Sequence, residues 1–319
     1  MKRLLGKIWK PLTSLAVLVI LWNKIDVDDV MVSIWDARIG YLFLALITFL
    51  LAQIVSSQRY IFAMQTLNRE IPFFLALRVH FIGFWFSQLL PSGIGGDVVK
   101  IFMLKNRIGV SKAIRGTLLD RVSGLIFLML GVVVLLPAYQ LELQTFAMTA
   151  TLSALATIFF LALWASVYFN GNRAIKRMIP KPLRHISLLL NDIARFRQRK
   201  PLMQQLWTSA IVHTGGILGY ALVGMSLGIE LPILIYYLLV PLIFLISLIP
   251  ISLGGWGVRE AGSIGLFGLV GLPPEQAFAM SVLFGLMVIC ASLPGGILLL
   301  LSSPAPNGER RGDLSETQV

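Results

Sequence analysis

The chain has 319 residues, of which 57% are hydrophobic and only 13% are charged, about half the charged fraction of ordinary soluble domains. This composition excludes a typical soluble enzyme. The formal net charge is +12, from 27 Lys and Arg against 15 Asp and Glu, but the basic residues lie in short clusters between long apolar runs. Such runs, of about 20 residues, are long enough to cross a bilayer. The sequence therefore indicates an all-α polytopic membrane protein and no nucleic-acid partner.

The apolar runs give the expected helices in chain order. The first, Leu12–Trp22, follows four basic residues like the core of a signal peptide, but no small-residue cleavage site follows it, so we expect an anchor helix. We interpret residues 1–301 as one transmembrane domain and the polar residues 302–319 as a disordered cytoplasmic tail. Further helices are expected near residues 39–58, 71–90, 113–136, 146–168, 204–227, 232–249 and 276–301.

The distribution of Lys and Arg predicts the orientation. With the N-terminus inside, the basic residues of the loops fall on the inner side, except Lys24 and Arg38. This predicts a multi-pass protein of the cell (inner) membrane with cytoplasmic N- and C-termini. The assignment requires two runs to turn back, because otherwise the strongly basic loop 100–115 would lie on the wrong side.

Two breaks rich in proline and glycine are the candidates for these reversals. Each has a proline, two further residues, an aliphatic residue and then a Gly-Gly pair. The residues concerned are Pro91, Gly95 and Gly96 in the first break and Pro250, Gly254, Gly255 and Gly257 in the second. Broken backbone at membrane depth must be buried in protein or line a wet cavity. We therefore expect two re-entrant hairpins of opposite orientation, as in inverted-repeat transporters. The alternative is that proline and glycine only kink two spanning helices.

Charged residues follow each break. Asp97 would cap a short helix that also carries Lys100, and the positive end of such a helix attracts anions. In the second break Arg259 and Glu260 are adjacent. Neighbours on a helix point about 100° apart, so we expect each of them to pair elsewhere.

A third charged pair, Asp120 and Arg121, lies inside the run that follows the first break. By the same reasoning we expect a partner for each, and we predict one buried network of Asp97, Asp120, Arg121, Arg259 and Glu260 lining a polar cavity. The alternative is that Asp120 and Arg121 reach the cytoplasmic interface as structural anchors. Arg59 is interpreted as such an anchor.

Two further features concern the cytoplasmic side and possible cofactors. Within the basic segment 172–200, residues 182–199 have apolar side chains on one face and arginines among the polar positions, which predicts a helix on the inner leaflet or simply a basic loop. The only cysteine is Cys290, and the three histidines are widely spaced, so we expect no metal and no other cofactor.

The motifs PSGIGGDVVK, LLDRVSGL and PISLGGWGVREAG together resemble the lysylphosphatidylglycerol synthase transmembrane-region family of flippase-like proteins. The resemblance covers nearly the whole chain and maps the family's motif residues onto Pro91, Gly95, Gly96, Asp97, Asp120, Arg121, Pro250, Gly255, Gly257 and Glu260. Asp120 departs from the glutamate that the family often has before the arginine. In the best-understood members of that family, the membrane module resembles a flippase that moves aminoacylated phospholipid between leaflets, and a separate soluble domain makes that lipid. Residues 302–319 are too few to form such a domain.

The resemblance implies a lipid flippase rather than an enzyme. We expect a phospholipid or lipid-linked anion as substrate, with membrane lipids as partners and with oligomerisation or a partner protein left open. An intramembrane transferase that uses Asp97, Asp120 or Glu260 as general base is one alternative. A scaffold that recruits partners through the basic segment 172–200 is another.

Overall fold

The computed structural model describes residues 25–90, 95–143, 146–170, 184–195, 198–248 and 254–301, together with positions 14, 17, 19, 20 and 252. Within these residues the chain forms eleven helices and no strand. The helices are α2 (Val27–Trp35), α3 (Ile39–Thr66), α4 (Phe73–Leu89), α5 (Gly95–Ile108), α6 (Val110–Leu143), α7 (Phe146–Asn170), α9 (Arg184–Ala194), α10 (Arg199–Ser226), α11 (Ile233–Ser247), α12 (Val258–Gly268) and α13 (Pro274–Leu300).

Seven of the helices coincide with the apolar runs of the sequence: α3, α4, α6, α7, α10, α11 and α13. Four of them, α3, α6, α10 and α13, are long and apolar enough to cross a membrane. The predicted all-helical fold is therefore confirmed for the described residues, and the four long apolar helices are consistent with a polytopic membrane protein. The expected anchor helix Leu12–Trp22 lies largely outside the described residues, and the tail 302–319 lies wholly outside them.

Local sequence signals set several helix ends. Helices α4 and α11 each begin directly after a proline, Pro72 and Pro232, and α13 begins within the pair Pro273–Pro274. Proline fits a helix start because its φ is already helical and its missing N–H has no acceptor there. Helix α10 ends two residues before Gly228, whose φ of +73° suits the reversal that closes a helix C-terminus.

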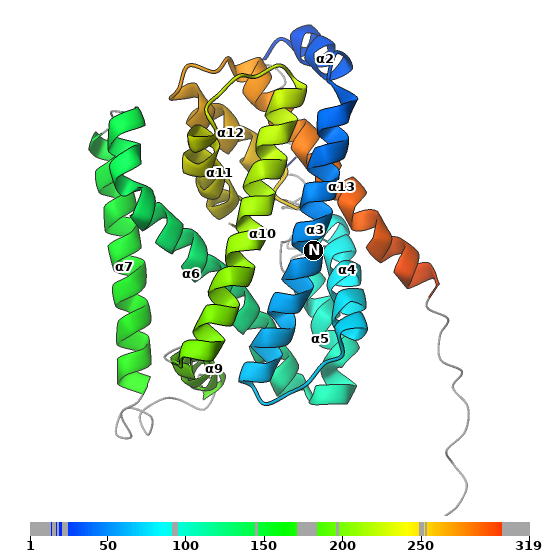
Figure 1. Cartoon of the computed structure of the whole chain (residues 1–319), viewed down its shortest axis with the longest axis vertical. Coiled ribbons are helices and arrows are strands. Elements are labelled where there is room, and N and C mark those ends of the chain that lie inside the picture. Colours follow the sequence, from blue (N-terminus) through cyan, green and yellow to red (C-terminus); the bar gives the residue numbers. More distant parts are fainter. Residues whose placement is uncertain are drawn as a thin grey trace, which may run out of the picture.

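The long helices α3 and α10 pack side by side through the centre of the molecule (Figure 1). The contact is close because Gly215 of α10 faces Ala52 of α3, where a Cβ on the glycine would lie 2.6 Å from the alanine Cβ. Between membrane helices there is no hydrophobic driving force, so small residues that permit close packing stabilise the contact instead. A small residue likewise permits close packing of α13 against α4, where Gly295 contacts the backbone of Phe81.

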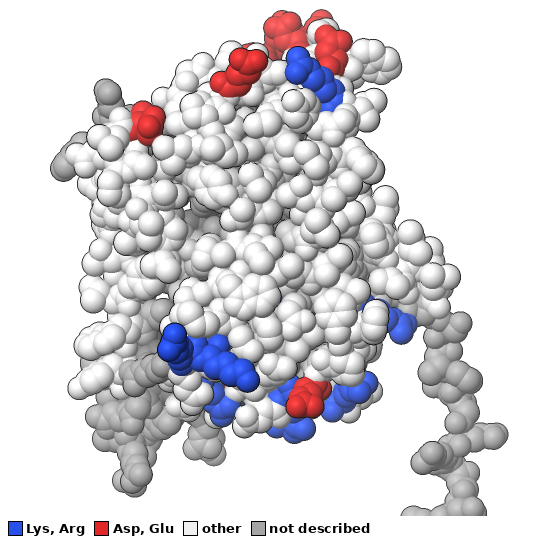
Figure 2. Space-filling view, viewed as in Figure 1, with Lys and Arg blue, Asp and Glu red and all other residues white. Residues whose placement is uncertain are grey.

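The two short helix pairs occupy opposite halves of the molecule. Helices α4 and α5 lie in the lower half of Figure 1, and α11 and α12 lie in the upper half. On the face shown in Figure 2, most Lys and Arg residues gather at the lower end and most Asp and Glu residues at the upper end. The first pair therefore starts from the basic end and the second from the acidic end.

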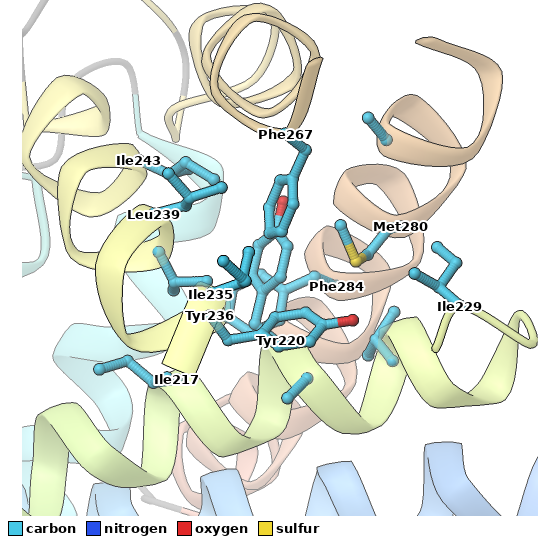
Figure 3. Close-up of a cluster of buried hydrophobic side chains, with 14 of the residues drawn as sticks. Ile217, Tyr220, Ile229, Ile235, Tyr236, Leu239, Ile243, Phe267, Met280 and Phe284 are labelled. Atoms are coloured by element: carbon cyan, nitrogen blue, oxygen red, sulfur yellow. The ribbon is translucent and has the colours of Figure 1, made fainter. Parts of the chain in front are cut away.

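The largest buried cluster lies in the upper half, between α10, α11, α12 and α13 (Figure 3). Tyr220 is fully buried there, with its ring 4.6 Å from that of Phe284 and stacked on Phe267 at 6.1 Å. The Tyr220 hydroxyl donates to Ser263 Oγ at 3.0 Å, so the buried phenol is satisfied. These contacts fix α12 between α10 and α13 and so position the second break.

Helices α4 and α5 touch at two glycines, and this contact gives a first prediction. A Cβ on Gly96 would collide with the carbonyl oxygen of Gly83, which is backbone and has little room to move. We expect Gly96→Ala to lower the free energy of unfolding by about 1–3 kcal/mol. The control is Gly131→Ala in α6, where no atom of the described residues lies within 4 Å of the new Cβ and helix propensity favours alanine. Thermal melts in detergent should separate the two variants; equal melting temperatures would contradict the close contact.

Candidate functional site

The first break leads into a cluster of charged side chains at the start of α5. Asp97, in the first turn of α5, forms a salt bridge with Arg121 of α6. Lys100 lies one turn further along α5, and its Nζ is 3.3 Å from Nδ1 of His80 in α4. The other ring nitrogen of His80 is 3.0 Å from Oε1 of Gln53. Because the lysine needs an acceptor lone pair on Nδ1, this geometry requires the neutral form of His80 when Lys100 is charged.

A second salt bridge lies beside the first. Arg59 of α3 donates from Nε to Oδ1 of Asp120 at 2.8 Å and from Nη2 to Oδ2 at 3.5 Å. Both residues are buried, with 8% and 5% of their surface exposed. The expectation that Asp120 and Arg121 point apart and find separate partners is confirmed. The interpretation of Arg59 as an interfacial anchor is wrong, because its guanidinium is held inside the bundle by Asp120.

The two arginines border a cavity of about 390 Å³ between α3, α6, α10 and α11. Gly124 allows this arrangement, since a Cβ there would lie 3.0 Å from Arg59 Nη1. His213 of α10 also faces the cavity, stacked on Phe127, and its Nε2 is buried without a hydrogen-bond partner in the described structure. The remaining wall is apolar and consists of Val122, Leu125, Leu128, Phe244 and Leu248. The cavity thus combines a cationic side with an apolar side.

An entirely apolar cavity of about 520 Å³ lies further along the same two helices. Met129 follows Leu128 of the first cavity on α6, and Leu245 follows Phe244 on α11. Helix α7 supplies the opposite wall with Leu152, Leu155 and Phe159. A charged cavity and an apolar one therefore succeed each other along α6.

The second break builds a different structure. Gly254, Gly255 and Gly257 all have positive φ angles, of +56°, +88° and +86°, a conformation that glycine adopts without steric cost. They lead into α12, where Glu260 turns back and its Oε2 accepts the Gly257 N–H at 2.5 Å. This is one half of a capping box, which satisfies a free N–H group at the helix start.

Arg259 and Glu260 pair with each other, contrary to the expectation that neighbours on a helix face apart. Oε1 of Glu260 accepts from Nη2 of Arg259 at 2.5 Å and from Ser281 Oγ at 3.2 Å. The arginine also lies over the Trp256 ring, 4.7 Å from its centroid. The pair forms because Glu260 bends toward the helix start while the longer Arg259 side chain reaches across it. Gly285 of α13 leaves the space, since a Cβ there would collide with the guanidinium.

The single network predicted from the sequence is therefore two clusters. Asp97, Asp120 and Arg121 share the first with Arg59 and Lys100, whereas Arg259 and Glu260 form the second. The two breaks nevertheless approach each other, because a Cβ on Gly254 would lie 3.8 Å from the carbonyl oxygen of Ser87, near the end of α4. Pro91 and Pro250, the prolines of the two breaks, lie outside the described residues.

Sequence reasoning missed the roles of Arg59 and His213. Both lie within long apolar helices, and nothing in the local pattern shows that α3 and α10 bring them to one cavity. The one available signal was that ionisable groups within membrane helices usually face the interior and carry function.

Comparison with known proteins adds the family. Residues 7–295 match the model of the family described as the lysylphosphatidylglycerol synthase TM region. The chain belongs to this family. The match extends over both breaks, all of the charged residues above and both cavities, so the whole candidate site lies within the lysylphosphatidylglycerol synthase TM region. A search of the curated proteins finds no match. Membership of the family supports a function that involves membrane lipids.

Proposed function

We propose that this protein is a flippase that moves a phosphate-bearing lipid between the two leaflets without covalent chemistry. The observation that carries the proposal is the cavity with Arg59, Arg121 and the unpartnered His213 Nε2 on one side and apolar side chains on the other. Guanidinium groups match the geometry of phosphate oxygens and bind them through paired hydrogen bonds. An amphipathic lipid presents this combination of a charged head and an apolar body.

The charges around this cavity favour an anion. Arg59, Arg121 and Lys100 are three cations, and Asp97 and Asp120 are two carboxylates. Within the described residues Lys100 contacts His80 and takes part in no salt bridge. A buried excess of one positive charge is costly in a medium of low dielectric constant. A bound phosphate group would neutralise it, which gives the site affinity for an anionic headgroup.

The neighbouring apolar cavity suits an acyl chain. Its lining is apolar throughout and it follows the charged cavity along α6 and α11. A lipid whose phosphate lies near Arg121 would extend its chain toward Met129 and Leu245. Burial of methylene groups there would contribute affinity without selecting a headgroup.

The short helices support a re-entrant arrangement. Helix α4 has 17 residues and α11 has 15, so at about 1.5 Å per residue each is shorter than the roughly 30 Å of a bilayer core. The pairs α4–α5 and α11–α12 would enter from opposite faces, and their breaks would meet near the middle. We assign the basic end in Figure 2 to the cytoplasm of a cell membrane, with both termini on that side.

The alternative of an intramembrane transferase has less support in the geometry. Each of its three candidate bases, Asp97, Asp120 and Glu260, accepts hydrogen bonds from a guanidinium. Carboxylates bound in this way compensate the positive charge of the arginine and fix the helices relative to each other.

A transport assay tests the proposal. The purified full-length chain is reconstituted in liposomes with fluorescent phospholipids of several headgroups, and exchange between leaflets is measured by quenching of the outer leaflet. We expect exchange of an anionic lipid that is reduced at least about tenfold by Arg121→Gln, since a hydrogen bond to a charged group contributes about 1.5–3 kcal/mol. Arg107→Gln, on the exposed end of α5, is the matched control and should stay within about twofold of the unchanged protein. Exchange no faster than in protein-free vesicles for every headgroup would refute the proposal.

A further inference from the structure

A separate polar cavity of about 410 Å³ lies at the basic end of the molecule. It forms where the end of α3 and the following turn meet the junction of α9 and α10. Its lining includes two cations, Arg195 and Lys200, and four carboxamide side chains, Gln65, Asn68, Gln198 and Gln204. None of the described residues that line it is acidic. The cavity shares no lining residue with the transport cavity described above.

Arg195 is held in place by neighbouring groups that do not neutralise its positive charge. Its Nη1 donates to the backbone carbonyl of Thr66, and its Nε is 4.0 Å from Oδ1 of Asp192. Asp192 is engaged by Arg115, which donates to both carboxylate oxygens at 2.6 Å. One carboxylate therefore serves two guanidinium groups, and the positive charge of Arg195 at the cavity is not neutralised. Its side chain is 41% exposed, so further N–H donors remain accessible.

Lys200 adds a second positive charge from the first turn of α10. Two cations that line the same cavity, with no Asp or Glu among its described lining residues, suit a phosphate group. The four carboxamides require a further explanation, because the positive-inside bias accounts for basic residues but not for amides. Each carboxamide offers both donors and an acceptor, which is the complement of a hydroxyl group.

We propose that this cavity binds a phosphate group that carries neighbouring hydroxyl groups. Arg195 and Lys200 hold the phosphate, and the carboxamides, Gln204 among them, hydrogen-bond the hydroxyls. This chemistry occurs in the polyol headgroup of a phospholipid and in a soluble polyol phosphate. The site goes beyond the transport function, since neither Arg59 nor Arg121 lines it.

The test uses the full-length chain in nanodiscs of a neutral lipid, with bound lipids counted by native mass spectrometry. The probes are phosphatidylinositol, which carries hydroxyls on the headgroup, and phosphatidylethanol, which has the phosphate but no hydroxyl. We expect phosphatidylinositol to bind at least about fivefold more tightly, the equivalent of one or two hydrogen bonds. Gln204→Met, which keeps the length of the side chain and removes the amide, should bring this ratio close to one.

The charge requirement has a matched pair of variants. Lys200→Gln should weaken phosphatidylinositol binding by about three- to tenfold. Arg199→Gln removes the same charge from the adjacent residue, which does not line the cavity, and should change binding less than about twofold. Both side chains are exposed, so thermal melts should confirm that both variants fold.

The source of the ligand is decided by competition. If inositol 1-phosphate displaces the lipid, the cavity accepts the soluble compound as well; if it does not, the site requires a lipid-anchored headgroup, and either result supports a built site. If Lys200→Gln and Arg199→Gln weaken phosphatidylinositol binding equally, the lipid responds only to the general positive charge of the surface, and the proposal is overturned. Equal binding of phosphatidylinositol and phosphatidylethanol would overturn it too.

Discussion

Asp120→Leu should destabilise the protein severely, by about 3–5 kcal/mol, because it leaves the buried guanidinium of Arg59 without its carboxylate. The arginine is only 8% exposed, and its guanidinium is packed against α6 and α10. Its remaining side-chain contact, with Ser209 Oγ at 3.5 Å, is too long to compensate. Thermal melts and the yield of monodisperse protein in detergent measure the effect. A melting temperature equal to that of the unchanged protein would contradict the buried ion pair.

The double variant Arg59→Met, Asp120→Leu separates the structural from the functional role of this pair. Replacing both members of a buried ion pair by apolar residues of similar volume is often neutral for stability. We therefore expect the double variant to melt within a few degrees of the unchanged protein. Transport should still be lost, because Arg59 is one of the two arginines that border the charged cavity. A folded double variant that transports at the normal rate would remove Arg59 from the proposed headgroup site.

The sequence could predict the helices because long apolar runs are dictated by bilayer thickness. The runs at 39–58, 204–227 and 276–301 correspond directly to α3, α10 and α13. The positions of the breaks were equally accessible, since proline and glycine leave backbone groups that only buried or wet surroundings can satisfy. These features depend on near neighbours along the chain.

The partners of the charged residues could not be predicted in the same way. Arg59 and Asp120 are 61 positions apart, and their pairing depends on how α3 packs against α6. The amphipathic segment 182–199 shows the same limit. Its residues Arg184–Ala194 form α9, as expected, but Ile193 is buried, and Leu189 and Leu190 pack in one cluster with Ala63 and Leu119 of the bundle. That side of α9 therefore meets protein where the sequence suggested lipid.

The pairing of Arg259 with Glu260 had a local signal that the helical-angle argument overlooked. Glu260 stands three residues after Gly257, the spacing at which a glutamate folds back onto the helix start. A side chain in that position no longer points along the ordinary helical direction. The rule that adjacent residues diverge by about 100° holds for the middle of a helix and fails in this first turn.

Glu260→Gln should be as damaging as the loss of Asp120. Glu260 has no exposed surface, and both of its oxygens accept hydrogen bonds, from the Gly257 N–H, from Arg259 and from Ser281. Glutamine keeps the shape but places an NH₂ group against one of these donors and leaves Arg259 as an uncompensated buried charge. We expect a loss of about 3–5 kcal/mol in stability, measured by thermal melts. Glu70→Gln, at an exposed position between α3 and α4, is the matched control and should be neutral.

The double variant Arg259→Met, Glu260→Gln should recover only part of this loss, in contrast to the pair Arg59 and Asp120. Removing the guanidinium eliminates the buried charge, but it does not give the Gly257 N–H a carboxylate acceptor equal to the one it has lost. The start of α12 then stays weakened, and the three glycines of positive φ before it can adopt other conformations. Full recovery in the double variant would show that Glu260 acts only as the counter-ion of Arg259.

Because Glu260→Gln disturbs this hairpin in any case, a loss of activity in that variant does not identify a general base. A transferase would have to be shown by a lipid product that a folded variant of Asp97 or Asp120 no longer makes.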